Sequence, residues 1–491
     1  MARAMATSLR LRQFRREAPC DLAWSLARDG GGSVGAMGVL EGLRDACPAL
    51  ALHTDAPALA AAGLDAMRPS RGRPEFARLD TRPIAVAEPA SAAEVAALVR
   101  WAAGARVPLV ARGGGSGLMG AAAVLVPAVV VDLRRLGAVA VDADACLVRA
   151  GAGATLAQVD AALAPHGLML GHDPWTVGVA TVGGALATNG LGYLGARAGS
   201  FGAQVRALEA VLADGTIVRT RPSPARSMGL DLARLLVGTE GTLGIITEAT
   251  LAALPVPEER VIHAWRLPSF DAGVAVAAGL RRSGVHPACL ELSARDAPGP
   301  ATVLLVFDGL DGEAALLAAR AARLVAAAGG SMLGGREAER QWEERHAIAE
   351  RWAAARRGGG GGEWPPDGAQ FDYAHVGVPL GGLAAVRATA RALVERHGLT
   401  FVEEGLWHWP ELYSVVVSGP PGSAEGVRAT IDGVCAAAVE AGGTLEYCHG
   451  VGWKLAHLAE REHGAAGLAV LRRLKAALDP ANIMNPGKGG L

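Results

Sequence analysis

The sequence predicts a protein of the α+β class with more than one domain. The chain has 491 residues, which exceeds what a single hydrophobic core usually organises. In the first part, short β-branched segments alternate with segments of helical periodicity, which is typical of sheets covered by helices. After the proline-containing segment 254–257 the glycine motifs cease while strands and helices continue, so we expect a second domain there.

The first domain is expected to open with a strand over 84–87 and a helix. Ser91 suits the N-cap of that helix, Glu94 occupies the capping-box position, and apolar residues recur at helical spacing as far as 103. Further expected elements are strands over 107–111, 128–133 and 146–150, a helix over 155–163, strands over 205–211 and 216–220 joined by an Asp-Gly turn, and a helix over 230–236.

The second domain is expected to repeat a strand-helix theme. Strands over 261–267 and 302–308 are each followed by a helix, one beginning at 271 and one over 312–328. Strands resume from 371, and a helix over 427–441 leads to the segment 443–450.

A short apolar strand runs directly into the loop Arg112-Gly113-Gly114-Gly115-Ser116-Gly117. Glycine accepts a positive φ and carries no Cβ, so such a loop lets several backbone N–H groups converge on one anion. The loop therefore predicts a pyrophosphate site, although taken alone a tight surface turn explains it equally well.

The same stretch contains a competing pattern. Residues 115–120 satisfy the G-x-G-x-x-G pattern of nicotinamide dinucleotide sites. That fold requires a full helix after the third glycine, whereas Pro127 and the strand expected from 128 arrive after about two helical turns of chain. The spacing therefore disfavours a nicotinamide site.

Two further glycine-rich segments follow, 180–190 and 238–248, and the C-terminal segment contains Asn485-Pro486-Gly487-Lys488. Their order and residue patterns resemble those of the PCMH-type FAD-binding domain of the vanillyl-alcohol oxidase superfamily. The C-terminal motif is similar to that of the branch containing D-lactate dehydrogenase, glycolate oxidase and alkylglycerone-phosphate synthase. The resemblance covers residue 83 to the end, and several motifs in the same order are more specific than any one of them.

The resemblance implies a two-subdomain FAD-binding domain over 79–257, an α+β substrate (cap) domain with an antiparallel sheet over 258–450, and a segment, 451–491, that returns to the FAD-binding domain. We expect residues 1–78 to be partly ordered. Because the first loop has no histidine or cysteine to attach a flavin, we expect noncovalent FAD. The cofactor-binding residues implied by the resemblance are Arg112, Gly113, Gly114, Gly115, Ser116, Gly117, Pro174, Trp175, Thr181, Gly183, Gly184, Thr188, Asn189, Gly199, Ser200, Glu240, Gly241, Gly244 and Ile246.

The resemblance also indicates a catalytic residue. In the resembled branch a histidine in the loop that corresponds to the segment 443–450 lies over the flavin. The matching residue in this chain is His449. It can take a hydroxyl proton while a hydride leaves the same carbon. A structural histidine in a buried loop is the alternative. The 2-hydroxyacid members usually have Glu-His-Gly, whereas this chain has Cys448-His449-Gly450.

A second departure concerns the segment 406–413. Many relatives carry His-x-Gly-Asp-Gly-Asn-x-His there, and some use its histidines with an acid to hold a divalent metal. That motif is missing here, so we expect no metal site. Tyr413 stands at the second histidine position, and a tyrosine on this strand is the proton-transfer group in the alkylglycerone-phosphate synthase pattern. A half-buried strand tyrosine is the alternative.

Arg345 and Arg351 are the candidates for binding a substrate carboxylate, with solvated helix charges as the favoured alternative. The synthase pattern has an arginine where this chain has Glu291, so the hydroxyacid group resembles the chain better there. We expect an FAD-dependent oxidoreductase acting on CH-OH groups, with a small 2-hydroxy acid of the D-lactate or glycolate type as substrate. Two alternatives stay open: an alkylglycerone-phosphate-synthase-like FAD enzyme without net redox change, and a non-catalytic FAD-binding subunit.

The net charge, the cysteine spacing and the length of the apolar runs restrict the partners and the compartment that we expect. The formal net charge of −1 gives no electrostatic reason to expect a nucleic-acid partner. The 6 cysteines contain no C-x-x-C pair, which indicates a reducing compartment rather than a disulfide framework. No apolar run reaches the ~20 residues of a membrane-spanning helix. We therefore expect a cytoplasmic enzyme with a small-molecule substrate and no transmembrane segment, and leave open the electron acceptor and a homodimer.

Overall fold

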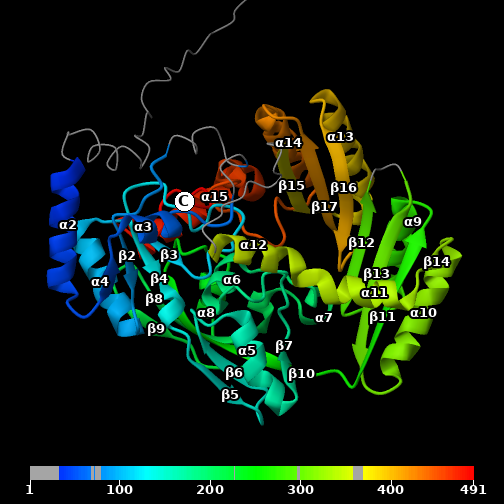
Figure 1. The fold of residues 1–491 in the computed structure, drawn as a ribbon, viewed down its shortest axis with the longest axis horizontal. Coiled ribbons are helices and arrows are strands. Elements are labelled where there is room, and N and C mark those ends of the chain that lie inside the picture. The colour runs from blue at the N-terminus through cyan, green and yellow to red at the C-terminus, as the bar shows by residue number, and fades with distance from the viewer. Residues whose placement is uncertain (1–31, 68–70, 72–78, 226, 296–298, 358–368) are drawn as a thin grey trace, which may run out of the picture.

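The computed structural model describes residues 32–67, 71, 79–225, 227–295, 299–357 and 369–491. The expectation for residues 1–31 lies outside this part of the chain. The described strands form three sheets, and Figure 1 shows the third sheet, with α9, α10, α13 and α14 around it, standing beside the other two. None of the described helices combines the length and the apolar character needed to cross a membrane.

The first sheet carries the first glycine loop. Its strand order is β1-β2-β4-β3, with β2, β4 and β3 parallel and β1 antiparallel to β2. Every residue of β4 is buried, as expected of a valine-rich central parallel strand. The elements are α2 (Gly32–Ala46), β1 (Ala51–His53), α3 (Ala56–Ala62), β2 (Ala85–Glu88), α4 (Ala92–Ala105), β3 (Leu109–Arg112) and β4 (Val129–Asp132).

The second sheet is antiparallel and carries the other two glycine loops on its connections. Its order is β5-β6-β10-β8-β9, and β7 also pairs with β10. One buried apolar core joins it to the first sheet. The elements are β5 (Val139–Asp142), β6 (Leu147–Gly151), α5 (Leu156–Leu163), β7 (Leu168–Leu170), α6 (Val182–Thr188), α7 (Gly195–Ala198), β8 (Val205–Val211), β9 (Ile217–Arg219), α8 (Leu232–Leu236) and β10 (Ile245–Pro255).

The third sheet is antiparallel, with seven strands in the order β14-β11-β13-β12-β16-β17-β15 and a separate core. Its strands are β11 (Glu259–Leu267), β12 (Cys289–Arg295), β13 (Ala301–Gly309), β14 (Ser331–Met332), β15 (Gln370–Gly377), β16 (Thr400–Trp407) and β17 (Leu412–Gly419). The helices are α9 (Phe270–Arg282), α10 (Glu313–Ala327), α11 (Gly335–Glu343), α12 (Ala347–Arg357), α13 (Leu383–Arg396), α14 (Ala424–Glu440) and α15 (Ala459–Leu478).

A buried ionic group joins strand β15 to one residue from the N-terminal part of the chain and one from the C-terminal part. Asp372 accepts hydrogen bonds from Arg71 Nε and from Lys454 Nζ, each at 2.7 Å. All three side chains are buried, and the Arg71 guanidinium lies 4.1 Å from the centre of the Tyr373 ring. This group fixes the strand that carries His375.

The segment after α15 returns to the first sheet. Met484 forms a parallel bridge with Leu109 of β3. The buried Lys475 Nζ donates to the Met484 carbonyl at 2.6 Å and to the Thr242 carbonyl at 2.8 Å. The C-terminal residues therefore lie against the first and third glycine loops.

Candidate functional site

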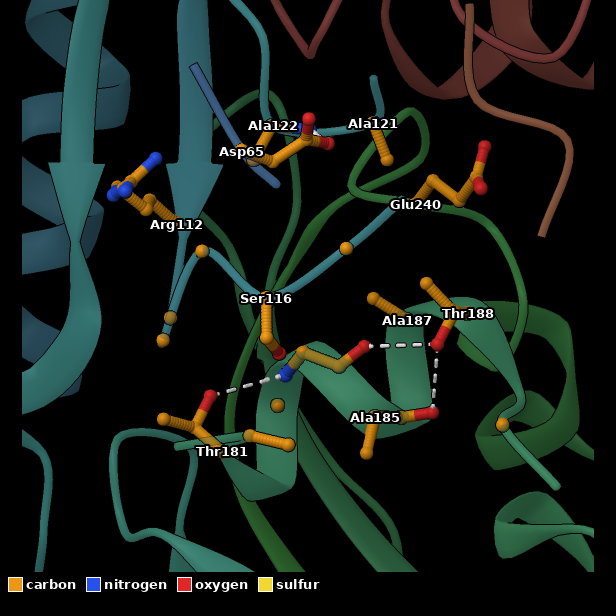
Figure 2. Close-up of a pocket in the computed structure, with 18 of the residues that line it drawn as sticks. Asp65, Arg112, Ser116, Ala121, Ala122, Thr181, Ala185, Ala187, Thr188 and Glu240 are labelled. Carbon is orange, nitrogen blue, oxygen red and sulfur yellow. Dashed lines mark hydrogen bonds between the residues drawn. The ribbon is translucent and has the colours of Figure 1, made fainter. Parts of the chain in front are cut away.

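A cavity lies where the three glycine-rich loops meet, as Figure 2 shows from one side. The first loop follows β3, the second surrounds the N-terminus of α6, and the third precedes β10. Sixteen of the predicted cofactor-binding residues line this cavity, namely Arg112, Gly113, Gly114, Gly115, Ser116, Gly117, Pro174, Trp175, Thr181, Gly183, Gly184, Thr188, Glu240, Gly241, Gly244 and Ile246.

Two glycines of the first loop leave no room for a side chain. A Cβ on Gly113 would lie 2.0 Å from Thr181 Oγ1, and a Cβ on Gly114 would lie 2.0 Å from the carbonyl oxygen of Val179. Gly115 has a φ of +64°. Glycine is required at these positions because the first and second loops pack directly against each other.

Arg112 joins this loop to the segment before the first sheet. Its Nη1 donates to the carbonyls of Leu64 and Ala62 at 2.7 and 3.3 Å, and its Nη2 donates to that of Ala61 at 3.2 Å. Figure 2 shows the side chain directed away from Ser116. Arg112 therefore clamps residues 61–64 against the loop, a role that the sequence analysis did not foresee.

The second loop begins α6. Thr181 is the N-cap, and its Oγ1 accepts a hydrogen bond from the Gly184 N–H at 3.4 Å. A Cβ on Gly183 would lie 2.7 Å from the Ala152 Cβ, so the helix start packs closely on β6 and its continuation. A helix N-terminus favours a negative charge in front of it.

The third loop is tied to the C-terminal motif. Asn485 Nδ2 donates to the carbonyls of Glu240 at 2.6 Å and of Ala121 at 2.8 Å. The Glu240 carboxylate accepts the N–H of Gly452 at 2.8 Å. Burial raises the pKa of Glu240 to about 7, although the Gly452 hydrogen bond and the charge of Lys488 oppose the shift.

Three predicted cofactor residues do not line the cavity. Asn189 ends α6 with a φ of 52°, and its Oδ1 accepts the N–H of Gly202 at 3.0 Å. Gly199 ends α7 with a φ of 72°, and Ser200 precedes the short 3₁₀ helix Phe201–Gln204. These residues shape the turn between α6 and β8, so we no longer assign cofactor contacts to them.

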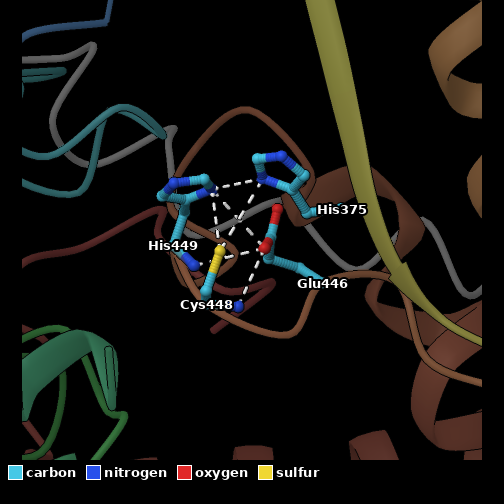
Figure 3. Close-up of side chains that lie close together, drawn as sticks. All are labelled: His375, Glu446, Cys448 and His449. Carbon is cyan, nitrogen blue, oxygen red and sulfur yellow. Dashed lines mark hydrogen bonds and ion pairs between the residues drawn. The ribbon is translucent and has the colours of Figure 1, made fainter. Parts of the chain in front are cut away.

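The cap contributes Cys448 and His449 to the cavity wall. Together with Glu446 and with His375 on β15 they form a group that we call the His-Cys cluster (Figure 3). The Nδ1 atoms of His375 and His449 are 3.0 Å apart, and Cys448 Sγ lies 3.7 and 3.4 Å from them, respectively. The predicted catalytic histidine therefore lies beside the predicted cofactor loops.

Glu446 fixes the backbone of this segment. Its Oε1 accepts the N–H groups of Tyr447, Cys448 and His449 at 3.0, 3.0 and 3.2 Å. Burial would raise the pKa of Glu446, but the adjacent histidines and the backbone hydrogen bonds outweigh it and lower the pKa to about 2. An ionised carboxylate oxygen therefore lies 3.6 Å from His449 Nδ1.

His375 is the partner that orients His449. Burial is the main reason that the pKa of His375 falls to about 3, so its ring is neutral at pH 7. Two facing Nδ1 atoms form a hydrogen bond only if one of them carries a proton, and the Glu446 carboxylate favours that proton on His449. His449 Nε2 then keeps a free lone pair, on the ring edge that Figure 3 shows turned away from the other three side chains.

The structure does not bring Tyr413 to His449. Tyr413 is 0 % exposed, and its hydroxyl donates to Glu404 Oε2 at 3.3 Å. His375 lies directly opposite Ser414 in the pairing of β15 with β17, so those two side chains share one face of the sheet. Tyr413, the next residue along β17, points to the other face. We therefore withdraw it as the proton-transfer group.

The two predicted substrate arginines are also outside the cavity lining. Arg345 Nε donates to Asp173 Oδ2 at 2.9 Å, and its guanidinium lies 4.1 Å from the centre of the Trp342 ring. Arg351 is exposed on α12. Arg345 thus joins the cap to the segment before Pro174, and we withdraw both arginines as substrate ligands.

Among the cavity residues that the sequence analysis did not single out are two with ionisable side chains, Asp65 and His172. Asp65 comes from the segment before the first sheet, its Oδ1 accepts the N–H of Met67 at 3.0 Å, and burial raises the pKa of its carboxyl. His172 stacks on Phe201 with ring centres 4.5 Å apart, and burial lowers its pKa to about 3. Neither residue belongs to a glycine motif; for His172 the available signal was its position two residues before Pro174.

Two family models match the chain. One, described as an FAD binding domain, matches residues 83–221, and the other, described as the C-terminal domain of FAD linked oxidases, matches residues 256–489. The chain belongs to the FAD-linked oxidases. Its cofactor is therefore FAD, and the protein is an oxidoreductase, as the sequence predicted.

Curated relatives match most of the chain. It is 29% identical over 425 residues to a D-lactate dehydrogenase of Archaeoglobus fulgidus, which covers 82% of this chain and 90% of the relative. It is 27% identical over 440 residues to the glycolate oxidase subunit GlcD of Bacillus subtilis, covering 83% and 88%. A shorter match, 30% identical over 167 residues, joins it to an alkyldihydroxyacetonephosphate synthase of Trypanosoma brucei brucei, covering 34% and 27%.

Solved structures share the fold. An alkyldihydroxyacetonephosphate synthase superposes with a TM-score of 0.73 at 19% identity, covering 92% of this chain and 85% of the other. A p-cresol methylhydroxylase superposes with a TM-score of 0.72 at 16% identity, covering 93% and 97%. At such low identities the superpositions establish the fold alone. They confirm the predicted α+β architecture with a PCMH-type FAD-binding domain.

Proposed function

We propose that this protein oxidises the hydroxyl-bearing carbon of a small 2-hydroxy acid of the D-lactate or glycolate type. FAD, when bound, accepts the hydride from that carbon. Support for the substrate class comes from relatives named D-lactate dehydrogenase and glycolate oxidase subunit, each matched over more than four-fifths of both chains. Support for the chemistry comes from the position of His449 on the cavity wall.

We propose that the three-loop cavity holds the FAD noncovalently. Gly113 and Gly114 line the cavity and carry no side chain, which suits the close approach of a pyrophosphate to their backbone. The Cβ clashes indicate that glycine is needed for the first loop to pack on the second, and this packing shapes the cavity in which the cofactor is expected.

In this proposal His449 Nε2 takes the hydroxyl proton of the substrate. His375 accepts the hydrogen bond from His449 Nδ1 and so maintains the tautomer with a free Nε2. Protonation makes the His449 ring positive, and the Glu446 carboxylate 3.6 Å from Nδ1 stabilises that charge. The single observation that carries the proposal is this facing pair of histidines beside the cavity.

Anaerobic mixing with a panel of 2-hydroxy acids tests the proposal. We expect at least one acid to bleach the flavin absorbance of the wild-type protein, and His449→Gln to slow that reduction about 10²- to 10⁴-fold. His166→Gln, at an exposed position outside the cavity, is the matched control and should reduce at the wild-type rate. Absence of bleaching by every acid, in a protein that retains FAD, would contradict the proposal and favour the reading without net redox change.

A further inference from the structure

We propose that His375, Glu446, Cys448 and His449 bind a zinc ion, and that the bound ion withdraws His449 from catalysis. The sequence analysis expected no metal site, because the histidine motif of many relatives is missing from the segment 406–413. The His-Cys cluster lies elsewhere, on β15 and in the segment after α14. Its ligands therefore do not depend on that motif.

The geometry of the cluster suits a tetrahedral ion. One ligand atom from each residue lies within 4.8 Å of all the others. Zinc bonds of about 2.0–2.1 Å to nitrogen or oxygen and about 2.3 Å to sulfur place tetrahedral ligand atoms roughly 3.3–3.8 Å apart. The observed separations are 3.0 Å between the two Nδ1 atoms, and 3.4 and 3.7 Å from Cys448 Sγ to them. Separations of up to 4.8 Å within the cluster must shorten by about 1 Å as the ion binds, through rotation of the imidazole rings and the carboxylate.

The donor set selects the metal. A thiolate, two imidazoles and a carboxylate are ligands for zinc, whereas magnesium and calcium prefer oxygen atoms alone. The donors are also held in advance. Glu446 Oε1 accepts three backbone hydrogen bonds from its own segment, so Oε2 is the oxygen that would bind the ion. The Tyr447 N–H donates to the His375 carbonyl at 3.1 Å, which ties that segment to β15.

Occupation of the site changes the state of His449. Bonding of the ion to His449 Nδ1 requires the ring proton to reside on Nε2, and the Cys448 thiol releases its proton to solvent as the metal–sulfur bond forms. Four protein ligands also fill the coordination sphere, so the ion has no open position for a substrate oxygen. A zinc-loaded protein therefore has no free Nε2 lone pair on His449. This consequence rests on the proposed function, whereas the binding site itself does not.

Zinc binding is measured on the oxidised holoenzyme, without substrate, at free zinc concentrations fixed by a chelating buffer. We expect one zinc per chain by metal analysis after desalting. Cys448→Ser should weaken binding at least about 100-fold, because it removes the thiolate itself and not merely an outer partner of a ligand. Cys146→Ser replaces an exposed cysteine and is the matched control, expected to bind zinc like the wild type. If Cys448→Ser loses its FAD, His375→Asn replaces it as the ligand-deficient variant.

Each outcome decides part of the proposal. Absence of retained zinc, or equal affinity in wild type and Cys448→Ser, would overturn the site and leave the 2-hydroxy acid proposal standing. Zinc retention with an unchanged rate of flavin reduction would overturn the withdrawal of His449. Zinc retention with a rate that falls in proportion to occupancy, and recovers on chelation, supports both parts. A protein that binds zinc, but whose zinc-free form is bleached by no acid, would confirm the site and refute the proposed function.

Discussion

Replacement of His375 tests how His449 is held in its reactive form. The two Nδ1 atoms are 3.0 Å apart, and His375 is neutral because burial lowers its pKa to about 3. Asparagine can place its Oδ1 close to the position of the histidine Nδ1 and so keeps an acceptor, whereas leucine fills a similar volume without one. We therefore expect His375→Leu to slow flavin reduction and His375→Asn to preserve most of the rate.

The magnitude follows from the interaction that is lost. A hydrogen bond between neutral groups contributes about 0.5–1.5 kcal/mol net, and an unsatisfied buried donor costs about 1–3 kcal/mol. A cost of 1.4 kcal/mol corresponds to a factor of about 10, so His375→Leu should reduce the rate about 10- to 100-fold. That loss is smaller than the loss expected for His449 itself, because the base remains present but spends less time in the productive tautomer.

The assay is anaerobic stopped-flow reduction of the bound flavin by the best acid of the panel. A purely structural role for His375 would impair both variants alike, whereas an orienting role separates leucine from asparagine. In the double variant with His449→Gln, the leucine substitution should cause no further loss, since both changes remove one function. Equal rates for leucine and asparagine, or full additivity in the double variant, would refute the reasoning.

Three further predictions concern the cavity and its supports. Gly114→Ala should lower FAD retention at least about 10-fold, because the new Cβ would lie 2.0 Å from the backbone oxygen of Val179, which cannot rotate away. Asp372→Asn should lower the free energy of unfolding by about 3–5 kcal/mol, measured with urea, because it leaves two buried cations without their carboxylate. Glu240→Gln should flatten the pH dependence of stability between about pH 4.5 and 7. The folded-state pKa of Glu240 is raised to about 7, so the folded protein holds this proton more tightly and loses up to about 3 kcal/mol as pH rises through that window.

Matched controls accompany these variants. Gly104→Ala adds a Cβ with nothing within 4 Å and should leave FAD retention unchanged. Asp311→Asn and Glu395→Gln change exposed carboxylates and should leave stability within about 0.5 kcal/mol of the wild type. Retention of FAD by Gly114→Ala, an unchanged urea midpoint for Asp372→Asn, or an unaltered pH profile for Glu240→Gln would each count against the corresponding contact.

Local features of the fold were predictable because their causes are local. Ser91 Oγ accepts the Glu94 N–H at 3.2 Å, and Thr155 forms a capping box with Gln158, so both helices begin where the sequence indicates. The glycine loops were recognisable because a required glycine leaves a visible sequence pattern. Pro174 and Trp175 were found through the family resemblance, and both line the cavity.

The contacts that the sequence analysis did not predict depend on pairing between distant segments of the chain. His375 is 74 residues from His449 in the sequence, and only the register of β15 against β17 brings it to the cavity side of the sheet. The same register points Tyr413 to the opposite face. Asp65 precedes every glycine motif and reaches the cavity because Arg112 binds the carbonyls of residues 61–64. No pattern along the chain reports such contacts.

The hydrogen bonds from Asn485 have a consequence for biosynthesis. Its side chain bridges the carbonyls of Ala121 and Glu240, which emerge from the ribosome hundreds of residues earlier. Until residue 485 has left the ribosome, those two carbonyls lack this donor, and the hydrogen bonds that join the two sides of the three-loop cavity cannot form. We therefore expect nascent chains to acquire flavin only after translation has passed this point, so the yellow colour should appear as one of the last steps of maturation.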